Sequence, residues 1–259
     1  RAWLRIAAGD APDGAGGEQD EASGPWALLA DAHDQLARGD HRAAVETTQL
    51  AAQLLGTTDL GEPNTREARD LAIYLRSEAL ANLSALSEAE RGYARLAESP
   101  EWGRARLRLA QVQLAQGRPR DARRTLLTDP RLVNTLPGAR AIVEAGVSIA
   151  EDPLASRGER EEAIALAARL LDTSVPPHES LPLALRARAA NGDPAGALEF
   201  ARRIAELREI DAAETLRAAE LVHRSAPEAA AALRNALASR AGDDPDVLLQ
   251  RAVALADAG

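Results

Sequence analysis

Apolar residues recur at helical spacing along most of this chain. After Pro25, segments rich in alanine and leucine alternate with short stretches of glycine, aspartate, proline and serine, and runs of β-branched residues are almost absent. This pattern is typical of amphipathic helices. It predicts an all-α protein with about thirteen helices between residues 25 and 259. Because the predicted loops are only a few residues long, we expect the helices to form antiparallel hairpins.

Turn residues predict several helix ends. In Gly192-Asp193-Pro194, the glycine suits the end of one helix, the aspartate suits the N-cap of the next, and the proline suits its first position. Similar helix starts are expected at Ser99, at Asp244 and, with a glutamate three residues later, at Asn64 and Ser87.

The predicted hairpins resemble one another. Gly39, Gly117 and Gly192 are each followed five residues later by an alanine, at positions 44, 122 and 197. Equivalent alanines at 89, 163 and 230 give intervals of 45, 33, 41, 34 and 33 residues. We expect the glycine to close the first helix of a hairpin and the alanine to let the second helix approach it. Loops at residues 56–65 and 151–160 are expected to account for the two longer intervals.

This internal repeat resembles the tetratricopeptide repeat (TPR) family, whose period is about 34 residues and whose second helix carries an alanine followed by an aromatic residue. Ala89 and Tyr93 match that pattern, and Trp26 and Trp102 lie near the starts of first helices. The resemblance implies a right-handed α-solenoid of TPR-like helix hairpins, with about six repeats plus a terminal helix. A compact orthogonal bundle is the alternative.

The two ends of the chain have a different character. Residues 9–24 contain five acidic residues, five glycines and no large apolar residue, so residues 1–24 are predicted to be an N-terminal segment and mobile acidic linker. Residues 25–259 are predicted to be the repeat domain. The chain lacks an initial methionine, and its last predicted helix, 244–259, has no partner helix. We therefore expect it to be part of a longer protein.

Composition narrows the classes of partner. The net charge is −9, which argues against a nucleic-acid partner, and no apolar run approaches the roughly 20 residues of a membrane span. All 31 basic residues are arginine, and this lysine-free, alanine-rich composition suggests a GC-rich bacterial gene. The absence of cysteine fits the cytoplasm and the periplasm equally, so the localisation is left open.

The residue types needed for most kinds of catalysis are missing. Without cysteine or lysine the chain has no thiolate nucleophile, thiolate metal site or Schiff base. Its four histidines, at 33, 41, 178 and 223, do not have metal-binding spacing, and no phosphate-binding glycine loop occurs. We therefore expect no catalytic residue, no cofactor and no metal.

A binding surface remains as the candidate site. In a TPR-like array the first helices would line a concave groove. The predicted groove residues are Trp26, His33, Tyr74, Glu78, Asn82, Arg104, Arg108, Gln111 and Arg186. Arg104 and Arg108 lie four residues apart on one helix, so they are expected to hold a carboxylate together. The alternative is that they pair with neighbouring glutamates or are simply solvated.

The function that follows is a non-catalytic protein–protein interaction scaffold. Its partner would be another protein or peptide, one with an acidic segment, bound in the concave groove. The alternative is a regulatory or accessory repeat domain of a larger bacterial enzyme or signalling protein. An enzymatic helical toroid is disfavoured, because aromatic residues make up only 2% of the chain. The oligomeric state is left open.

Overall fold

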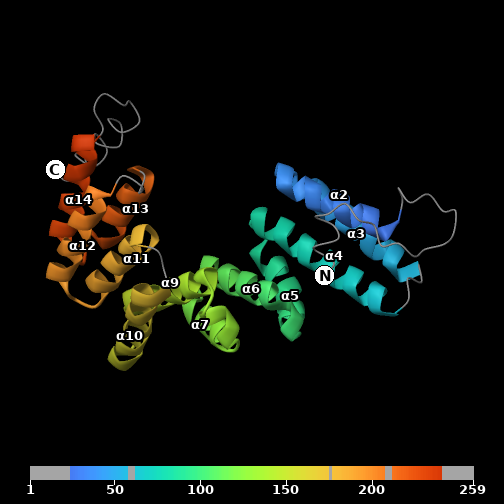
Figure 1. Ribbon diagram of the computed structural model, residues 1–259, viewed down its shortest axis with the longest axis horizontal. Helices are drawn as coiled ribbons and strands as arrows, with labels where there is room; N and C mark the ends of the chain where they lie inside the picture. Colours follow the sequence, from blue (N-terminus) through green and yellow to red (C-terminus); the bar gives the residue numbers. More distant parts are fainter. Residues whose placement is uncertain (1–23, 58–61, 175–176, 208–211, 241–259) are drawn as a thin grey trace. The chain divides into compact units, whose positions relative to one another are not determined.

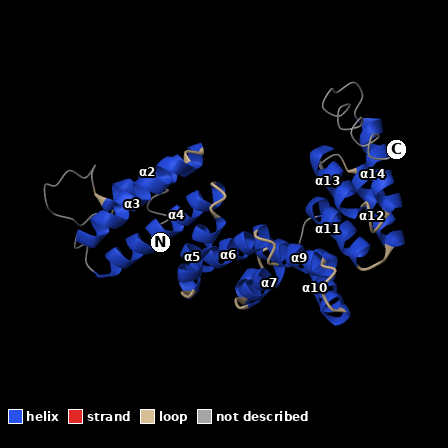
Figure 2. Ribbon diagram, turned by 180° about the vertical axis from the view of Figure 1, so that it is seen from behind, coloured by secondary structure: helices blue, strands red, loops and turns tan. Residues whose placement is uncertain are grey.

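The protein is helical throughout the part that is described. The computed structural model describes residues 24–57, 62–174, 177–207 and 212–240. These residues form thirteen α-helices and one short 3-10 helix, and they contain no strand (Figure 1; Figure 2). The predicted all-α fold class is therefore confirmed. The predicted acidic linker up to residue 23 and the predicted helix 244–259 lie outside the described residues.

The chain divides into two compact units, the first ending at Arg118 and the second beginning at Pro119. The single repeat domain over residues 25–259 stays a prediction. Each unit is described by itself below.

Unit 1 is a run of helices in which each packs on the next. It contains α2 (Pro25–Arg38), α3 (His41–Thr57), α4 (Glu62–Asn82), α5 (Leu86–Ala97), the 3-10 helix η2 (Pro100–Trp102) and α6 (Gly103–Ala115). In addition to these consecutive contacts, α2 packs on α4, and Figure 1 shows α2, α3 and α4 side by side. The unit's core is formed by leucine, alanine and tyrosine side chains that include Leu29, Leu71, Leu75 and Tyr93, all at most 1% exposed.

Unit 2 contains eight α-helices in the described residues. It contains α7 (Pro119–Leu127), α8 (Pro130–Val133), α9 (Leu136–Glu151), α10 (Arg157–Ser174), α11 (Pro177–Ala190), α12 (Pro194–Glu206), α13 (Ala212–Val222) and α14 (Pro227–Arg240). The helix α9 packs on α7, α10 and α11. The last two hairpins lie against each other, with α13 on α11 and α14 on α12. Leu185, Ile204 and Leu233 are fully buried in their shared core.

The predicted helix ends at the three turn glycines are confirmed. Gly39, Gly117 and Gly192 adopt φ angles of 84°, 71° and 72°, the left-handed conformation in which glycine ends a helix without steric cost. The Asp193 carboxylate then accepts a hydrogen bond of 2.9 Å from the backbone N–H of Gly196, and Pro194 occupies the first turn of α12. The sequence therefore predicted both ends of this turn correctly.

The repeated small residues are also buried where the pattern placed them. The six alanines of the predicted second helices are at most 1% exposed: Ala44, Ala89, Ala122, Ala163, Ala197 and Ala230. The residues at the corresponding positions of the first helices, Ala32, Ser77, Ala110 and Leu185, are at most 2% exposed. The short side chain of each second-helix alanine allows close helix packing, in agreement with the predicted role, whereas Leu185 departs from the small-residue pattern.

Some local predictions were wrong. α4 begins at Glu62 and α5 at Leu86, so Asn64 and Ser87 lie inside helices rather than at their N-caps. Ser99 precedes the 3-10 helix instead of an α-helix, and its side chain makes no capping hydrogen bond. The two longer repeat intervals are not due mainly to long loops. The first contains the long helices α3 and α4, and the second contains the additional short helix α8.

Candidate functional site

Five of the predicted groove residues come together on α4 and α6. The Nε atom of Arg108 lies 2.7 Å from a carboxylate oxygen of Glu78, and Arg108 Nη1 donates a 3.0 Å hydrogen bond to Oε1 of Gln111. Asn82 donates a 2.8 Å hydrogen bond from Nδ2 to the backbone carbonyl of Glu78. Tyr74 lies one helical turn before Glu78 on the same helix and is 5% exposed. Arg108 therefore already has a carboxylate partner within the protein.

Aromatic rings surround this ion pair. The ring of Tyr74 stacks on that of Trp102, with centroids 5.6 Å apart and an interplanar angle of 29°. It also meets Tyr93 edge to face, at 5.9 Å and 68°. Both are arrangements that aromatic pairs prefer. Three of the chain's six aromatic residues are thus concentrated where α4, α5 and η2 meet. We call Tyr74, Glu78, Tyr93, Trp102 and Arg108 the aromatic–ion cluster.

Burial and charge act together in this cluster. Burial raises the pKa of Tyr74 to about 12, and the nearby negative charge of Glu78 adds to the effect. The same two causes, burial first and Glu78 second, raise the pKa of Tyr93. Burial opposes the charged form of Arg108, but the Glu78 carboxylate keeps the pKa of Arg108 above its ordinary value. The tyrosines are therefore neutral and Arg108 is charged at neutral pH.

The other four predicted groove residues lie elsewhere. Trp26 is half-buried on α2 and packs against the core of unit 1, and the Nδ1 atom of His33 on the same helix is 3.7 Å from a carboxylate oxygen of Asp34. Arg104 is exposed on α6. Arg186 belongs to unit 2, where it forms a bidentate pair with Glu151, with N···O distances of 3.1 and 2.9 Å. The predicted binding role of all nine residues stays a prediction.

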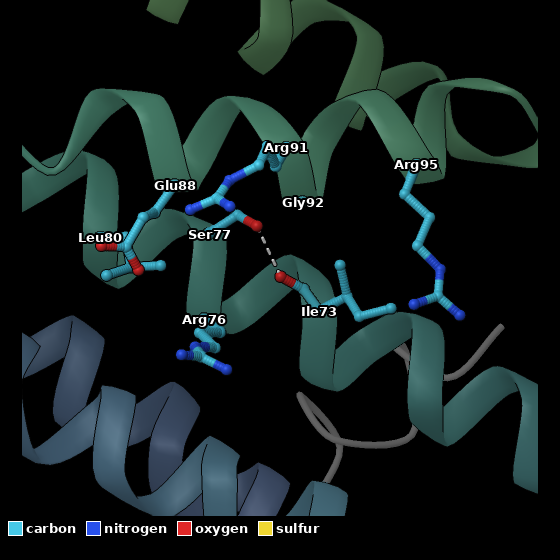
Figure 3. Close-up of a pocket in the computed structure, with 8 residues that line it drawn as sticks. All are labelled: Ile73, Arg76, Ser77, Leu80, Glu88, Arg91, Gly92 and Arg95. Atoms are coloured by element: carbon cyan, nitrogen blue, oxygen red, sulfur yellow. Dashed lines mark hydrogen bonds between the residues drawn. The ribbon is translucent and has the colours of Figure 1, made fainter.

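A groove lies between α4 and α5. It has a volume of about 440 Å³ and is lined by Ile73, Arg76, Ser77, Leu80, Glu88, Arg91, Gly92 and Arg95 (Figure 3). This volume is within the roughly 300–1,000 Å³ that is usual for ligand sites. We call it the α4–α5 groove. None of its lining residues was among the predicted site residues.

The floor of the α4–α5 groove is a close contact between two small residues. A Cβ atom on Gly92 would lie 2.0 Å from Oγ of Ser77, so only glycine fits here without movement of Ser77. Ser77 is buried, and its hydroxyl donates a 2.7 Å hydrogen bond to the carbonyl of Ile73 (Figure 3). The half-buried Ile73 and Leu80 supply apolar walls.

Arginines form the rim of the groove. Arg76 extends from α4, and Arg91 and Arg95 extend from α5, and all three are exposed (Figure 3). Within the described part of the chain, none of the three forms an ion pair or a side-chain hydrogen bond. The arrangement therefore presents guanidinium N–H donors beside apolar walls, which suits a ligand with carboxylates and apolar groups. The spacing of Arg91 and Arg95, four residues apart, was a signal in the sequence, but their proximity to Arg76 was not.

Arginines of unit 2 are used differently. Arg120 bridges two carboxylates on either side of the α9–α10 turn, with Nη1 2.7 Å from Oδ2 of Asp152 and Nε 2.5 Å from Oε1 of Glu159. Arg123 pairs with Glu162 in the same region. These pairs join α7 to α10 and to the turn before it, so they have a structural explanation.

The described residues hold neither a cluster suited to a metal ion nor a helix suited to a membrane span. No group of three or more histidine, aspartate or glutamate side chains is arranged there to hold a metal ion. Across those same ranges, no helix combines the length and the apolar character needed to cross a membrane.

No protein-family model matches this chain, and no curated protein matches it in sequence. The resemblance to tetratricopeptide repeats therefore rests on the residues quoted above. What the protein binds has to be inferred from the geometry and charge of its own side chains.

Proposed function

We propose that this protein is a non-catalytic interaction module that binds a segment of a partner protein, and that its helices form a TPR-like right-handed α-solenoid. The single observation that carries the binding function is the α4–α5 groove, which has apolar walls and an arginine rim that lacks ion-pair partners within the described residues. Grooves of this kind between helices are common sites for peptide segments.

The packing within each unit supports the array. Most consecutive helices within a unit pack together, and some helices two positions apart also meet, as α2 does with α4 and α9 does with α11. Burial of all six repeated alanines is consistent with repeats that share one register. In such an array each hairpin contacts its neighbours, and its outer surfaces remain available to partners.

Selection from a random peptide library displayed on phage tests this function. The complete chain is the bait, and a variant with Arg76→Ala, Arg91→Ala and Arg95→Ala is the counter-selection bait. The proposal predicts enriched peptides that bind the unmodified chain and lose affinity for the triple variant. If no peptide is enriched, or if every enriched peptide binds both proteins equally, the groove is not a peptide site and the proposed function fails.

A further inference from the structure

The charge of the α4–α5 groove opposes the charge of the whole chain. The protein carries a net charge of −9, yet the groove combines three arginines with one glutamate, a local excess of two positive charges. Two other arginines of unit 1 are paired with internal carboxylates: Arg108 with Glu78, and Arg118 with Glu90. The groove arginines differ from these two in having no carboxylate partner within the described residues.

The groove is also more than a cluster of charges. Between the arginines lie the half-buried side chains of Ile73 and Leu80, and the Ser77–Gly92 contact forms the floor. Burial of an apolar group against this floor adds a favourable free energy that a small inorganic anion cannot supply. A volume of about 440 Å³ also exceeds what one phosphate group fills. The matching ligand has both carboxylates and apolar side chains.

We propose that the α4–α5 groove binds an acidic, partly apolar peptide segment of a partner protein, with Arg76, Arg91 and Arg95 donating hydrogen bonds to its carboxylates. Its apolar side chains lie on Ile73 and Leu80. This inference rests on the proposed function and specifies the chemistry of the partner. It also transfers the carboxylate-binding role from Arg104 and Arg108, on α6, to arginines on α4 and α5.

Glu88 allows the effect of charge in the groove to be tested in the opposite direction. It is exposed, it lines the groove one helical turn before Arg91, and it is the groove's one carboxylate. A carboxylate at this position repels an acidic ligand and lowers its affinity. Removing that charge should therefore strengthen binding, an effect that damage to the fold would not produce.

Fluorescence anisotropy with a labelled peptide of alternating leucine and glutamate tests the inference on the full chain. We expect binding that weakens as salt is added, and little binding of the matched leucine–glutamine peptide. Arg91→Gln combined with Arg95→Gln should weaken the acidic peptide by roughly tenfold or more, and Glu88→Gln should strengthen it by roughly threefold. The charge-matched control combines Arg42→Gln with Arg202→Gln, two exposed arginines that do not line the groove, and should change affinity by less than about twofold.

Equal binding of the acidic peptide by the groove variant and the control variant would overturn the inference. So would equal binding of the glutamine peptide, or competition by inorganic phosphate that abolishes the difference between the two peptides when sodium chloride at the same ionic strength does not. These results are distinguishable from failure of the proposed function. If phage selection yields neutral peptides that require the groove arginines, the peptide-binding function stands and only the acidic chemistry is wrong.

Discussion

Two faces of α4 use charge in opposite ways. On one face Glu78 holds Arg108 at 2.7 Å, and the rings of Tyr74 and Tyr93 pack around the pair. On the other face Arg76 stands beside the α4–α5 groove without an ion-pair partner in the described chain. An arginine that is already paired and half-buried contributes to the fold, and an exposed unpaired one is available to a ligand. The difference depends on what the neighbouring helix supplies, not on the arginine's own sequence context.

The largest difference in stability is expected between two residues of α5, one in the aromatic–ion cluster and one on the rim of the α4–α5 groove. Tyr93→Ala removes a fully buried ring from the aromatic–ion cluster and should destabilise the protein by about 3–5 kcal/mol. Arg91→Ala, two residues earlier on the exposed groove rim, should change the free energy of unfolding by less than about 0.5 kcal/mol. Urea denaturation followed by circular dichroism measures both. Similar losses in the two variants would mean that the groove face is structural.

The next comparison concerns the arginines themselves. Arg108→Ala leaves the Glu78 carboxylate, whose side chain is 14% exposed, without its partner. We expect a loss of about 2 kcal/mol, below the ~3–5 kcal/mol of fully buried pairs because the Arg108 side chain is 46% exposed and partly screened by water. Arg76→Ala is the matched control on the groove face and should cost less than about 0.5 kcal/mol. Thermal unfolding of both variants tests this, and a loss for Arg108→Ala no greater than the control's would contradict the role given to the ion pair.

Alkaline pH should lower the stability that the aromatic–ion cluster gives to the fold. The chain has two tyrosines, both in the cluster, and burial followed by the charge of Glu78 raises the pKa of each, that of Tyr74 to about 12. Because the unfolded chain releases these protons near pH 10, the stabilisation is complete below that pH and declines as pH rises, by on the order of 1 kcal/mol per pH unit for each tyrosine. Absorbance at the tyrosinate band should show ionisation only well above pH 10. A transition near pH 10 in the folded protein would contradict the burial of both hydroxyls.

The weakest effect is expected at the exposed ion pairs that Arg120 of unit 2 forms with Asp152 and Glu159. The backbone N–H of Leu154 and then the guanidinium of Arg120 lower the pKa of Asp152, and Arg120 is the main cause of the lowered pKa of Glu159. Carboxylates with lowered pKa values stabilise the fold above their unfolded pKa, and this stabilisation is lost as pH falls through the folded values. Arg120→Gln should therefore lower the melting temperature slightly at neutral pH, and the difference from the unmodified protein should vanish in acid. A difference that is constant across this pH range would exclude the ion pairs as its cause.

The sequence predicted the fold class and the turn chemistry well, because both depend on local physics. Gly192 and Asp193 act on their own neighbours in the chain, and the repeated alanines report helix contacts at regular spacing. The starts of α4 and α5 were misplaced, because polar residues such as Asn64 and Ser87 are also tolerated within helices. The short helix α8 was missed because it interrupts the repeat period instead of following it.

The candidate site was less predictable for a related reason. Spacing along α6 identified Arg104 and Arg108 as a pair, but it could not show that Glu78, thirty positions earlier in the sequence, would reach Arg108. In the same way, nothing local indicates that Ser77 meets Gly92 and leaves a groove between their helices. Side-chain pairing across helices depends on tertiary packing, which a single sequence does not reveal.

Nuclear magnetic resonance of the arginine side-chain Nε–H groups, during titration with the leucine–glutamate peptide, tests the central claim most directly. Assignments would come from single Arg→Gln variants. The account predicts that the signals of Arg76, Arg91 and Arg95 shift in a saturable manner, while that of Arg108, held by Glu78, does not. Shifts at Arg104 and Arg108 with none at the groove arginines would contradict it and return the carboxylate-binding role to α6.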